Sequence, residues 1–220
     1  MRIVNPKYFD YIEIDQCSPE TIVIENPVML RNAVKELIDQ CNGDEGAYVI
    51  SENNLVLPIP KNVCLITDLF HLDFDEKGMK TRIQSHVADI CFDSQRSAQL
   101  VTEIKKYAYE LCEETLYPTV FNTDFTITDL IKFLNFRFYP DSEAFIETIA
   151  DYIYGLQALQ GKKLIITLSL KDYFELEEYK EFIKQMEYKN IALLMLERHI
   201  HQGLDDEKHL RIIDKDLCVI

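Results

Sequence analysis

Glycine is scarce in this chain, with six residues in 220. A phosphate-binding loop needs a strand, then glycines, then Gly-Lys-Ser/Thr opening a helix, so that backbone N–H groups face the phosphates. The chain contains neither G-x-x-x-x-G-K-S/T nor G-x-G-x-x-G. Gly161, Lys162 and Lys163 stand in the reverse order, because they follow a helical segment and precede an apolar strand. We interpret Gly161 as a helix stop. Nucleotide hydrolysis is left as an alternative hypothesis, which rests on Asp68 at the end of the apolar segment VCLITD.

Long apolar runs, a secretory signal and paired cysteines are also missing. The run IALLML at residues 191–196 is among the longest, far short of the roughly 20 residues that span a bilayer. The N-terminal segment carries acids where a signal peptide would need an apolar stretch, so we expect a cytoplasmic protein. The six cysteines include no C-x-x-C pair, which favours reduced, mostly buried thiols over a zinc site or a disulfide framework.

Basic residues are the minority, 23 against 38 acidic residues, for a net charge of −15. The average field of such a protein repels nucleic acid and anionic membranes. Residues 76–112 differ, with six basic and five acidic side chains. A segregated pattern of this kind allows an acidic protein to keep one basic surface for a phosphate backbone. Ordinary salt-bridged helix faces are the competing interpretation.

The apolar pattern predicts an α/β fold with a mostly parallel sheet and an inserted α-helical extension. Strand patterns alternate with helical ones before residue 71 and again after residue 161, and continuously apolar strands indicate parallel strands covered on both faces. We therefore expect residues 1–75 and 159–220 to form one discontinuous head domain around a single sheet. Residues 76–158 form the helical insertion, or leg, in which two long helices are expected to lie side by side.

Hydrolytic and metal sites receive little support from residue spacing. The chain has no G-x-S-x-G, and its five histidines have no obvious partner nucleophile. His199 and His201 could hold a metal with Asp205 and Asp206, although a solvated loop is the favoured interpretation. The acids of HLDFDE at residues 71–76 lack the glycine and final glutamate of an EF-hand loop, so we interpret them as a polar junction.

Three segments resemble the small adaptation protein of type II-A CRISPR systems: VCLITDLFHLDFDEKG, DLIKFLNF, and the long run from KKLIITLSL to IALLMLE. The resemblance covers essentially the whole chain. It implies a core similar in topology to P-loop nucleotide hydrolases, without the phosphate loop and without hydrolysis. It also implies a homotetrameric ring that threads double-stranded DNA ends through a basic central hole. Calcium would support the ring, and the integrase pair and the RNA-guided nuclease would be its partners in spacer acquisition.

Local charge, not a motif of that family, selects the candidate DNA-binding residues: Lys80, Arg82, Arg96, Lys105 and Lys106, with Lys132 and Arg137 in second rank. Relatives carry a dense acidic run before the helix that matches TITDLIKFLNF, whereas this chain reads LCEETLYPTVFNTDF. Glu113, Glu114 and Asp124 remain there as candidate calcium ligands, or other residues bind the ion. A nucleotide hydrolase dependent on Asp68 and a protein-interaction scaffold without DNA affinity are the alternatives.

Overall fold

The chain divides into two structural units in the computed structural model, which describes residues 1–15, 18–92, 94–140, 142, 144–204, 209–216 and 218. Met1–Asp73 and Pro140–Ile220 form the first, which we call the α/β unit, and Phe74–Tyr139 form the second, the helical unit. The sequence predicted that the helical leg ends at residue 158, but in the structure the helical unit already ends at Tyr139. The structure returns to the α/β unit at Pro140, because α6 (Phe145–Gln160) packs on the sheet strand β7 (Leu164–Leu168) and on α7 (Leu176–Tyr188).

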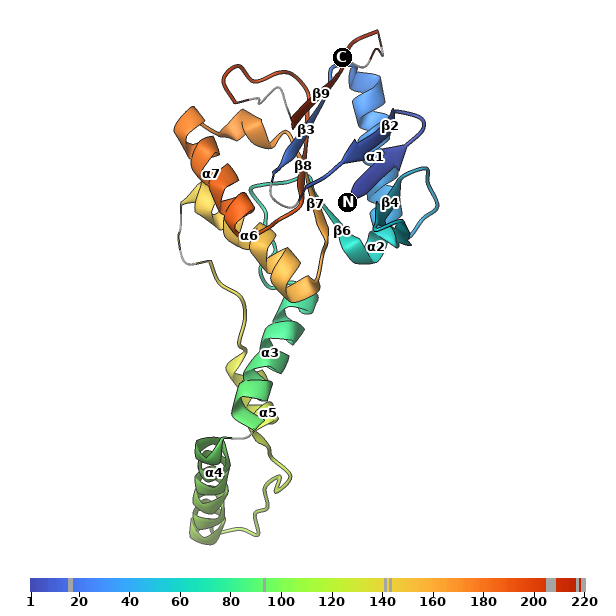
Figure 1. The fold of residues 1–220 in the computed structure, drawn as a ribbon. Helices are drawn as coiled ribbons and strands as arrows, with labels where there is room; N and C mark the ends of the chain where they lie inside the picture. Colours follow the sequence, from blue (N-terminus) through green and yellow to red (C-terminus); the bar gives the residue numbers. More distant parts are fainter. Residues whose placement is uncertain are drawn as a thin grey trace. The chain divides into compact units, whose positions relative to one another are not determined.

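A five-stranded parallel sheet forms the centre of the α/β unit, as expected from the sequence. Its strand order is β6 (Val63–Ile66), β7, β8 (Leu193–Glu197), β3 (Glu20–Ile24) and β9 (Leu210–Ile213), as labelled in Figure 1. Every residue of β3 and β8 is buried. Parallel strands that are covered on both faces consist of continuous apolar runs, and such runs in the sequence predicted these strands.

The expectation of a single sheet is wrong for four strands near the N-terminus. They form a separate antiparallel sheet in the order β2 (Phe9–Glu13), β1 (Arg2–Asn5), β4 (Val49–Glu52) and β5 (Leu55–Leu57). Asn53 and Asn54 alone separate β4 from β5, and both have positive φ, 50° and 63°. A two-residue turn of this kind joins antiparallel strands, whereas a parallel pair needs a long crossover.

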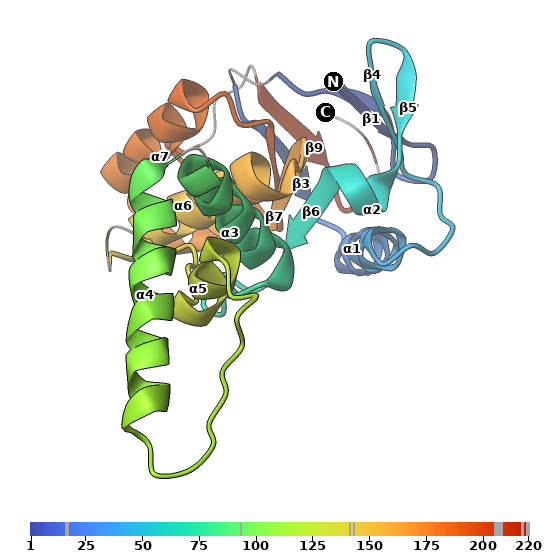
Figure 2. The ribbon, with the colours of Figure 1, turned by 90° about the horizontal axis from the view of Figure 1, so that it is seen from below.

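Helices cover both faces of the parallel sheet. In Figure 2, α1 (Pro27–Cys41) lies on one side of the sheet, and α6 and α7 lie on the other. Asn26 caps α1 by accepting hydrogen bonds from Val28 N and Met29 N, and Pro27 occupies its first turn. The predicted helix stop is confirmed, since Gly161 ends α6 with φ 70°. Leu30, Val34 and Leu37 are buried in the core, as the spacing of α1 predicts.

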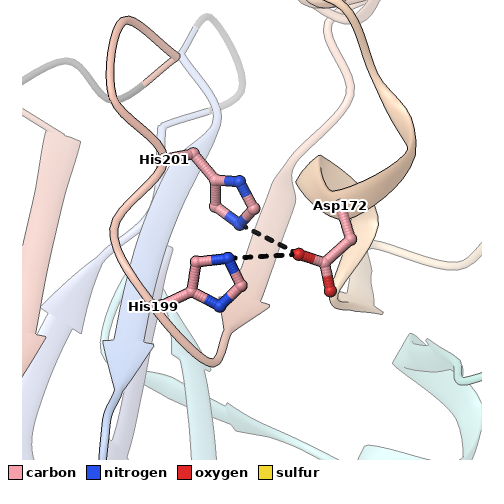
Figure 3. A group of neighbouring side chains, drawn as sticks. All are labelled: Asp172, His199 and His201. Carbon is pink, nitrogen blue, oxygen red and sulfur yellow. Dashed lines mark ion pairs between the residues drawn. The ribbon is translucent and has the colours of Figure 1, made fainter.

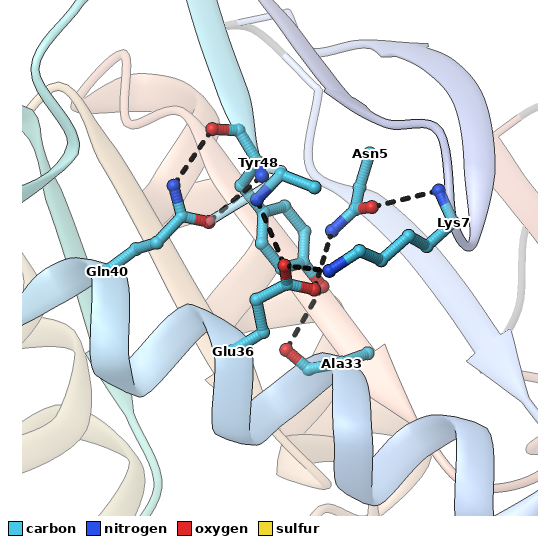
Figure 4. A network of polar contacts seen from close by, with 7 residues as sticks. Asn5, Lys7, Ala33, Glu36, Gln40 and Tyr48 are labelled. Carbon is cyan, nitrogen blue, oxygen red and sulfur yellow. Dashed lines mark hydrogen bonds and ion pairs between the residues drawn. The ribbon is translucent and has the colours of Figure 1, made fainter. Parts of the chain in front are cut away.

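A polar network fastens the antiparallel sheet to α1 (Figure 4). Glu36 of α1 accepts hydrogen bonds from Lys7 Nζ at 2.6 Å, Ala47 N at 3.0 Å and Asn5 Nδ2 at 3.3 Å. One turn further along, Gln40 exchanges two hydrogen bonds with the backbone of Tyr48. The contacts of Glu36 and Gln40 join three segments that are distant in sequence.

The short helix α2 (Ile59–Asn62) follows the antiparallel sheet and leads into β6.

The helical unit consists of α3 (Lys77–Phe92), α4 (Gln95–Glu114) and α5 (Ile127–Leu134). The expectation that the two long helices lie side by side is wrong: α3 packs mainly on α5, and α4 also contacts α5, whereas α3 and α4 touch only marginally or not at all. In the sequence, Thr126-x-x-Asp129 is close to a capping box and predicts the start of α5. The structure confirms this cap, because Thr126 N donates to Asp129 Oδ2 at 2.9 Å and Asp129 N donates back to Thr126 Oγ1. Across the described residues, none of the helices is both long enough and apolar enough to cross a membrane.

Candidate nucleic-acid interface

The basic residues singled out from the sequence all lie on the helical unit. Lys80 and Arg82 belong to α3, whereas α4 carries three of them, Arg96, Lys105 and Lys106. Lys132 lies in the last turn of α5, and Arg137 follows that helix. Lys80 and Lys105 are half-buried, and the other five are exposed. Each long helix therefore presents cationic groups to solvent.

One protomer does not gather these side chains onto one face. Arg96 and Lys105 are nine residues apart on α4, about two and a half turns, so they point to opposite sides of the helix. Lys80 and Arg82 are about half a turn apart on α3 and diverge in the same way. A basic surface made from all of them therefore needs more than one helix face, from one chain or from several.

Few of these cations are neutralised within their own unit. Lys106 pairs with Glu103 at 2.9 Å and Arg137 with Asp75 at 3.2 Å, both on exposed side chains. Across the part of the chain that the structure describes, no ion pair forms at Lys80, Arg82, Arg96, Lys105 or Lys132. Exposed pairs such as the first two contribute little to stability, and a phosphate competes with them readily.

The acidic excess is concentrated in the α/β unit. Residues 74–139 contain ten acidic and eight basic side chains, whereas the rest of the chain contains 28 acidic and 15 basic ones. The net charge of the helical unit is thus close to zero, and nearly all of the −15 belongs to the other unit. On average, a polyanion therefore meets less repulsion at the helical unit than at the α/β unit.

An apolar stripe runs along α4, formed by Leu100, Ile104, Tyr107 and Leu111. These residues recur at intervals of four, three and four, which places them on one face of the helix. Their exposed fractions are 45%, 37%, 61% and 45%, and no described residue of α4 is buried. An amphipathic helix of 20 residues with an uncovered apolar face is stabilised when another surface packs on it.

The candidate calcium ligands are not gathered within one protomer. Glu113 and Glu114 end α4, and Asp124 lies in the segment between α4 and α5, all three being exposed. Calcium takes six to eight oxygen ligands around one point. Over the described residues, the grouping of three metal-ligating side chains is found elsewhere, at Asp172, His199 and His201. Glu113, Glu114 and Asp124 do not fit a calcium site within this protomer, and calcium binding by them stays a prediction.

The carboxyl edge of the parallel sheet, where an α/β enzyme would bind a nucleotide, is arranged differently from a phosphate loop. A groove of about 760 Å³ lies there between the ends of β3, β7 and β8 and the length of α1 from Pro27 to Ile38. Asn26 Oδ1 already accepts Val28 N and Met29 N, each at 3.1 Å, so these helix N–H groups are used by the cap. Asp68 is held by Phe70 N at 2.9 Å and His71 Nδ1 at 2.7 Å, contacts that lower the pKa of its carboxyl.

The structure also corrects the expectation that no histidine has a partner nucleophile. His209 Nε2 lies 3.0 Å from Ser18 Oγ, and its Nδ1 lies 2.8 Å from Glu20 Oε1. Glu20 is the first residue of β3, and His209 directly precedes β9. The sequence could not reveal this trio, because Ser18 and His209 are 191 positions apart. The arrangement resembles a proton relay in its order of groups, and it also clamps two neighbouring strands together.

Comparisons with known proteins show the family to which this chain belongs. Residues 40–217 match the family described as CRISPR-associated protein (Cas_Csn2). The crystal structure of Stu0660 of Streptococcus thermophilus matches with a TM-score of 0.59 and 15% identity, over 96% of this chain and 74% of that one. The ADP conformation of MJ1267, an ATP-binding cassette of an ABC transporter, has a TM-score of 0.45 and 12% identity, over 96% and 85%, which is too low to support a shared fold. No curated protein matches the sequence. Because the family match spans most of the chain, this protein belongs to the Cas_Csn2 family of CRISPR-associated proteins.

Proposed function

We propose that this CRISPR-associated protein binds the ends of double-stranded DNA, independently of sequence, as a homotetrameric ring that has no catalytic activity. In this role it supports spacer acquisition in the cytoplasm beside the CRISPR integrase complex and the RNA-guided effector nuclease. Family membership supports the CRISPR context. The ring, the DNA ends and the partner proteins are inferences from the family resemblance of the sequence.

The observation that carries the DNA-binding proposal is the charge contrast between the two units. The helical unit contains eight basic and ten acidic residues. Five of the seven candidate DNA-binding cations form no ion pair in the described part of the chain. Lysine and arginine at such positions contact phosphates, which gives affinity without reading the base sequence. The acidic α/β unit meanwhile repels DNA from the remaining surface.

Assembly into a ring accounts for two features that a monomer leaves unexplained. The apolar stripe of α4 is exposed in one chain, and a second copy is the occupant that the family resemblance suggests. Basic side chains such as Arg96 and Lys105 diverge on one helix, but several copies around an axis each direct one helix face towards that axis. A modest basic surface repeated four times can then surround a duplex.

The decisive experiment combines mass measurement with DNA binding by the purified full-length chain. Size-exclusion chromatography with light scattering reports the mass, and a competition assay compares a linear duplex with a covalently closed circle of the same sequence. We expect a tetramer that prefers the linear duplex, because a closed ring of protein must thread an end. The proposal is rejected if the chain is monomeric and indifferent to linear DNA at low salt.

Three additions to this experiment separate the alternatives. Repeating both measurements with calcium and with a chelator shows whether the ion supports assembly, which the positions of Glu113, Glu114 and Asp124 in one protomer do not indicate. An assay of ATP turnover with magnesium tests the hydrolase alternative, and turnover that disappears in Asp68→Asn would contradict a non-catalytic role. The scaffold alternative would be supported if a pull-down with the chain recovers only protein partners and the chain has no affinity for DNA.

A further inference from the structure

Two neighbouring strands of the parallel sheet bring two histidines and an aspartate together (Figure 3). Asp172 lies in the 3-10 helix η1 (Leu170–Tyr173), which follows β7, and His199 and His201 follow the end of β8. Because β7 and β8 are adjacent and parallel, the segments that follow their carboxyl ends meet at one edge of the sheet. One ligand atom from each of the three side chains lies within 4.8 Å of the others.

The distances in this cluster fit a shared ion better than direct hydrogen bonds. Asp172 Oδ1 lies 3.4 Å from His199 Nε2 and 3.4 Å from His201 Nε2. Hydrogen bonds from nitrogen to oxygen are usually about 2.9 Å long. A tetrahedral ion with metal–ligand bonds of about 2.1 Å sets its ligand atoms about 3.4 Å apart, which is the edge of that tetrahedron. The two imidazole rings, with centroids 4.4 Å apart, both turn Nε2 towards the same carboxylate oxygen.

A buried carboxylate lies next to this cluster. Glu197, the last residue of β8, has a side chain with no exposed surface, and its Oε2 lies 3.5 Å from His201 Nε2. Its Oε1 accepts a hydrogen bond from Lys171 N at 3.2 Å, which fixes the orientation of the carboxylate. Glu197 thus places a second carboxylate oxygen beside the ligand nitrogen of His201.

We propose that Asp172, His199 and His201 bind one Zn²⁺ ion. Two imidazole nitrogens and one carboxylate oxygen suit a borderline ion such as zinc, whereas calcium and magnesium prefer ligand sets made entirely of oxygen. The side chain of His199 is 59% exposed and that of His201 only 11%, so the site has one open side where water completes the coordination. This site lies in the α/β unit and is independent of the proposed DNA-binding residues of the helical unit.

Asp172 was not among the partners that the sequence suggested for these histidines. Asp205 and Asp206 were the candidate carboxylates there, and they lie outside the described residues. Among the described residues, Asp172 is the acid that completes the cluster, although it precedes His199 by a complete helix and a strand. Spacing along the chain could not reveal it, because the contact depends on the pairing of β7 with β8.

Zinc binding is tested on the full-length chain without a histidine tag. The metal-free protein is exposed to Zn²⁺, desalted and analysed by elemental mass spectrometry, and the affinity is measured by isothermal titration calorimetry. We expect about one zinc per chain, with affinity reduced about tenfold or more in His199→Gln and lost in the His199→Gln/His201→Gln variant, because ligand nitrogens are removed. His86→Gln, which changes an exposed histidine of the helical unit, is the matched control and should bind zinc normally.

Two measurements keep the result unambiguous. Thermal unfolding of the metal-free variants shows whether each one folds, and Co²⁺ substitution reports the ligand type. Tetrahedral cobalt bound by nitrogen and oxygen absorbs in the visible region and lacks the near-ultraviolet thiolate band that the free cysteines would produce. No bound zinc in the wild-type chain, zinc retained by the folded double variant, or displacement of zinc by calcium would each overturn the proposal.

Discussion

Lys7 Nζ lies 2.6 Å from Glu36 Oε1, and this ion pair connects the segment after β1 to the centre of α1. The Lys7 side chain is 60% exposed, whereas that of Glu36 is only 14% exposed. Burial raises the pKa of Glu36, but hydrogen bonds from Lys7, Ala47 N and Asn5 outweigh that effect and hold the pKa below its ordinary value of 4.5. The folded state therefore favours the ionised carboxylate.

We expect Glu36→Gln to lower the free energy of unfolding by about 1–2 kcal/mol at pH 7, because a charged hydrogen-bond acceptor is lost. Since folding lowers the pKa of Glu36, its contribution is complete above about pH 4.5 and disappears as the pH falls through the lower folded value. Urea unfolding at pH 7 and near pH 3 measures this. The difference between the variant and the wild type should shrink at the acidic pH.

The matched control is Glu13→Gln, since Glu13 is 64% exposed and pairs with Arg2 on the sheet surface. An exposed pair of this kind contributes less than about 1 kcal/mol, so that variant should stay close to the wild type. A Glu36→Gln protein that is as stable as the wild type at pH 7, or a difference that grows on acidification, would contradict the assigned role of this ion pair.

The apolar stripe of α4 provides a test of assembly. Ile104→Gln combined with Leu111→Gln should shift the proposed tetramer to smaller species, because each buried aliphatic side chain stabilises an interface by roughly 1.5–3 kcal/mol. Light scattering after size exclusion reports the mass, and circular dichroism reports helix content. Tyr188→Gln on α7, where the side chain is 86% exposed, is the control in the α/β unit. An unchanged tetramer in the double variant would exclude the stripe as an interface.

The salt dependence of DNA binding tests the basic residues. For Lys105→Ala with Lys106→Ala, we expect weaker binding to linear duplex and a shallower plot of log affinity against log salt. The slope changes by about 0.9 for each phosphate contact that is removed. Fluorescence anisotropy over a series of salt concentrations measures both effects. Lys180→Ala, which removes an exposed and paired lysine of α7, should leave the slope unchanged. Equal slopes for all three proteins would remove Lys105 and Lys106 from the interface.

The trio of Ser18, His209 and Glu20 distinguishes a structural clamp from a catalytic relay. We expect no labelling by a fluorophosphonate reagent, because Glu20 and His209 connect β3 to β9 and the proposed function involves no acyl transfer. His209→Gln should lower the unfolding free energy by about 1–2 kcal/mol, since it breaks the hydrogen bond to the buried carboxylate of Glu20. Labelling that disappears in Ser18→Ala would instead identify a reactive serine and contradict the non-catalytic assignment.

Residue patterns were reliable where a local interaction determines the structure. Gly161 ends α6 because a left-handed residue is needed there, and Thr126 and Asp129 cap α5 across three positions. The parallel strands could be predicted because burial on both faces requires continuous apolar side chains. The short strand β1 (Arg2–Asn5) was missed, since four residues that include Arg2 and Asn5 carry no clear strand pattern.

The sequence by itself determined the fold class, the mixed α/β and helical organisation, and the charge contrast on which the DNA-binding proposal rests, because each follows from composition or from neighbours along the chain. Only the tertiary structure decided which strands leave the parallel sheet, that α6 belongs to the α/β unit, and that Asp172 meets His199 and His201. These features depend on pairings between distant segments. The apolar residues of a strand indicate that it is buried, but the packing of the whole unit determines which strand pairs with it.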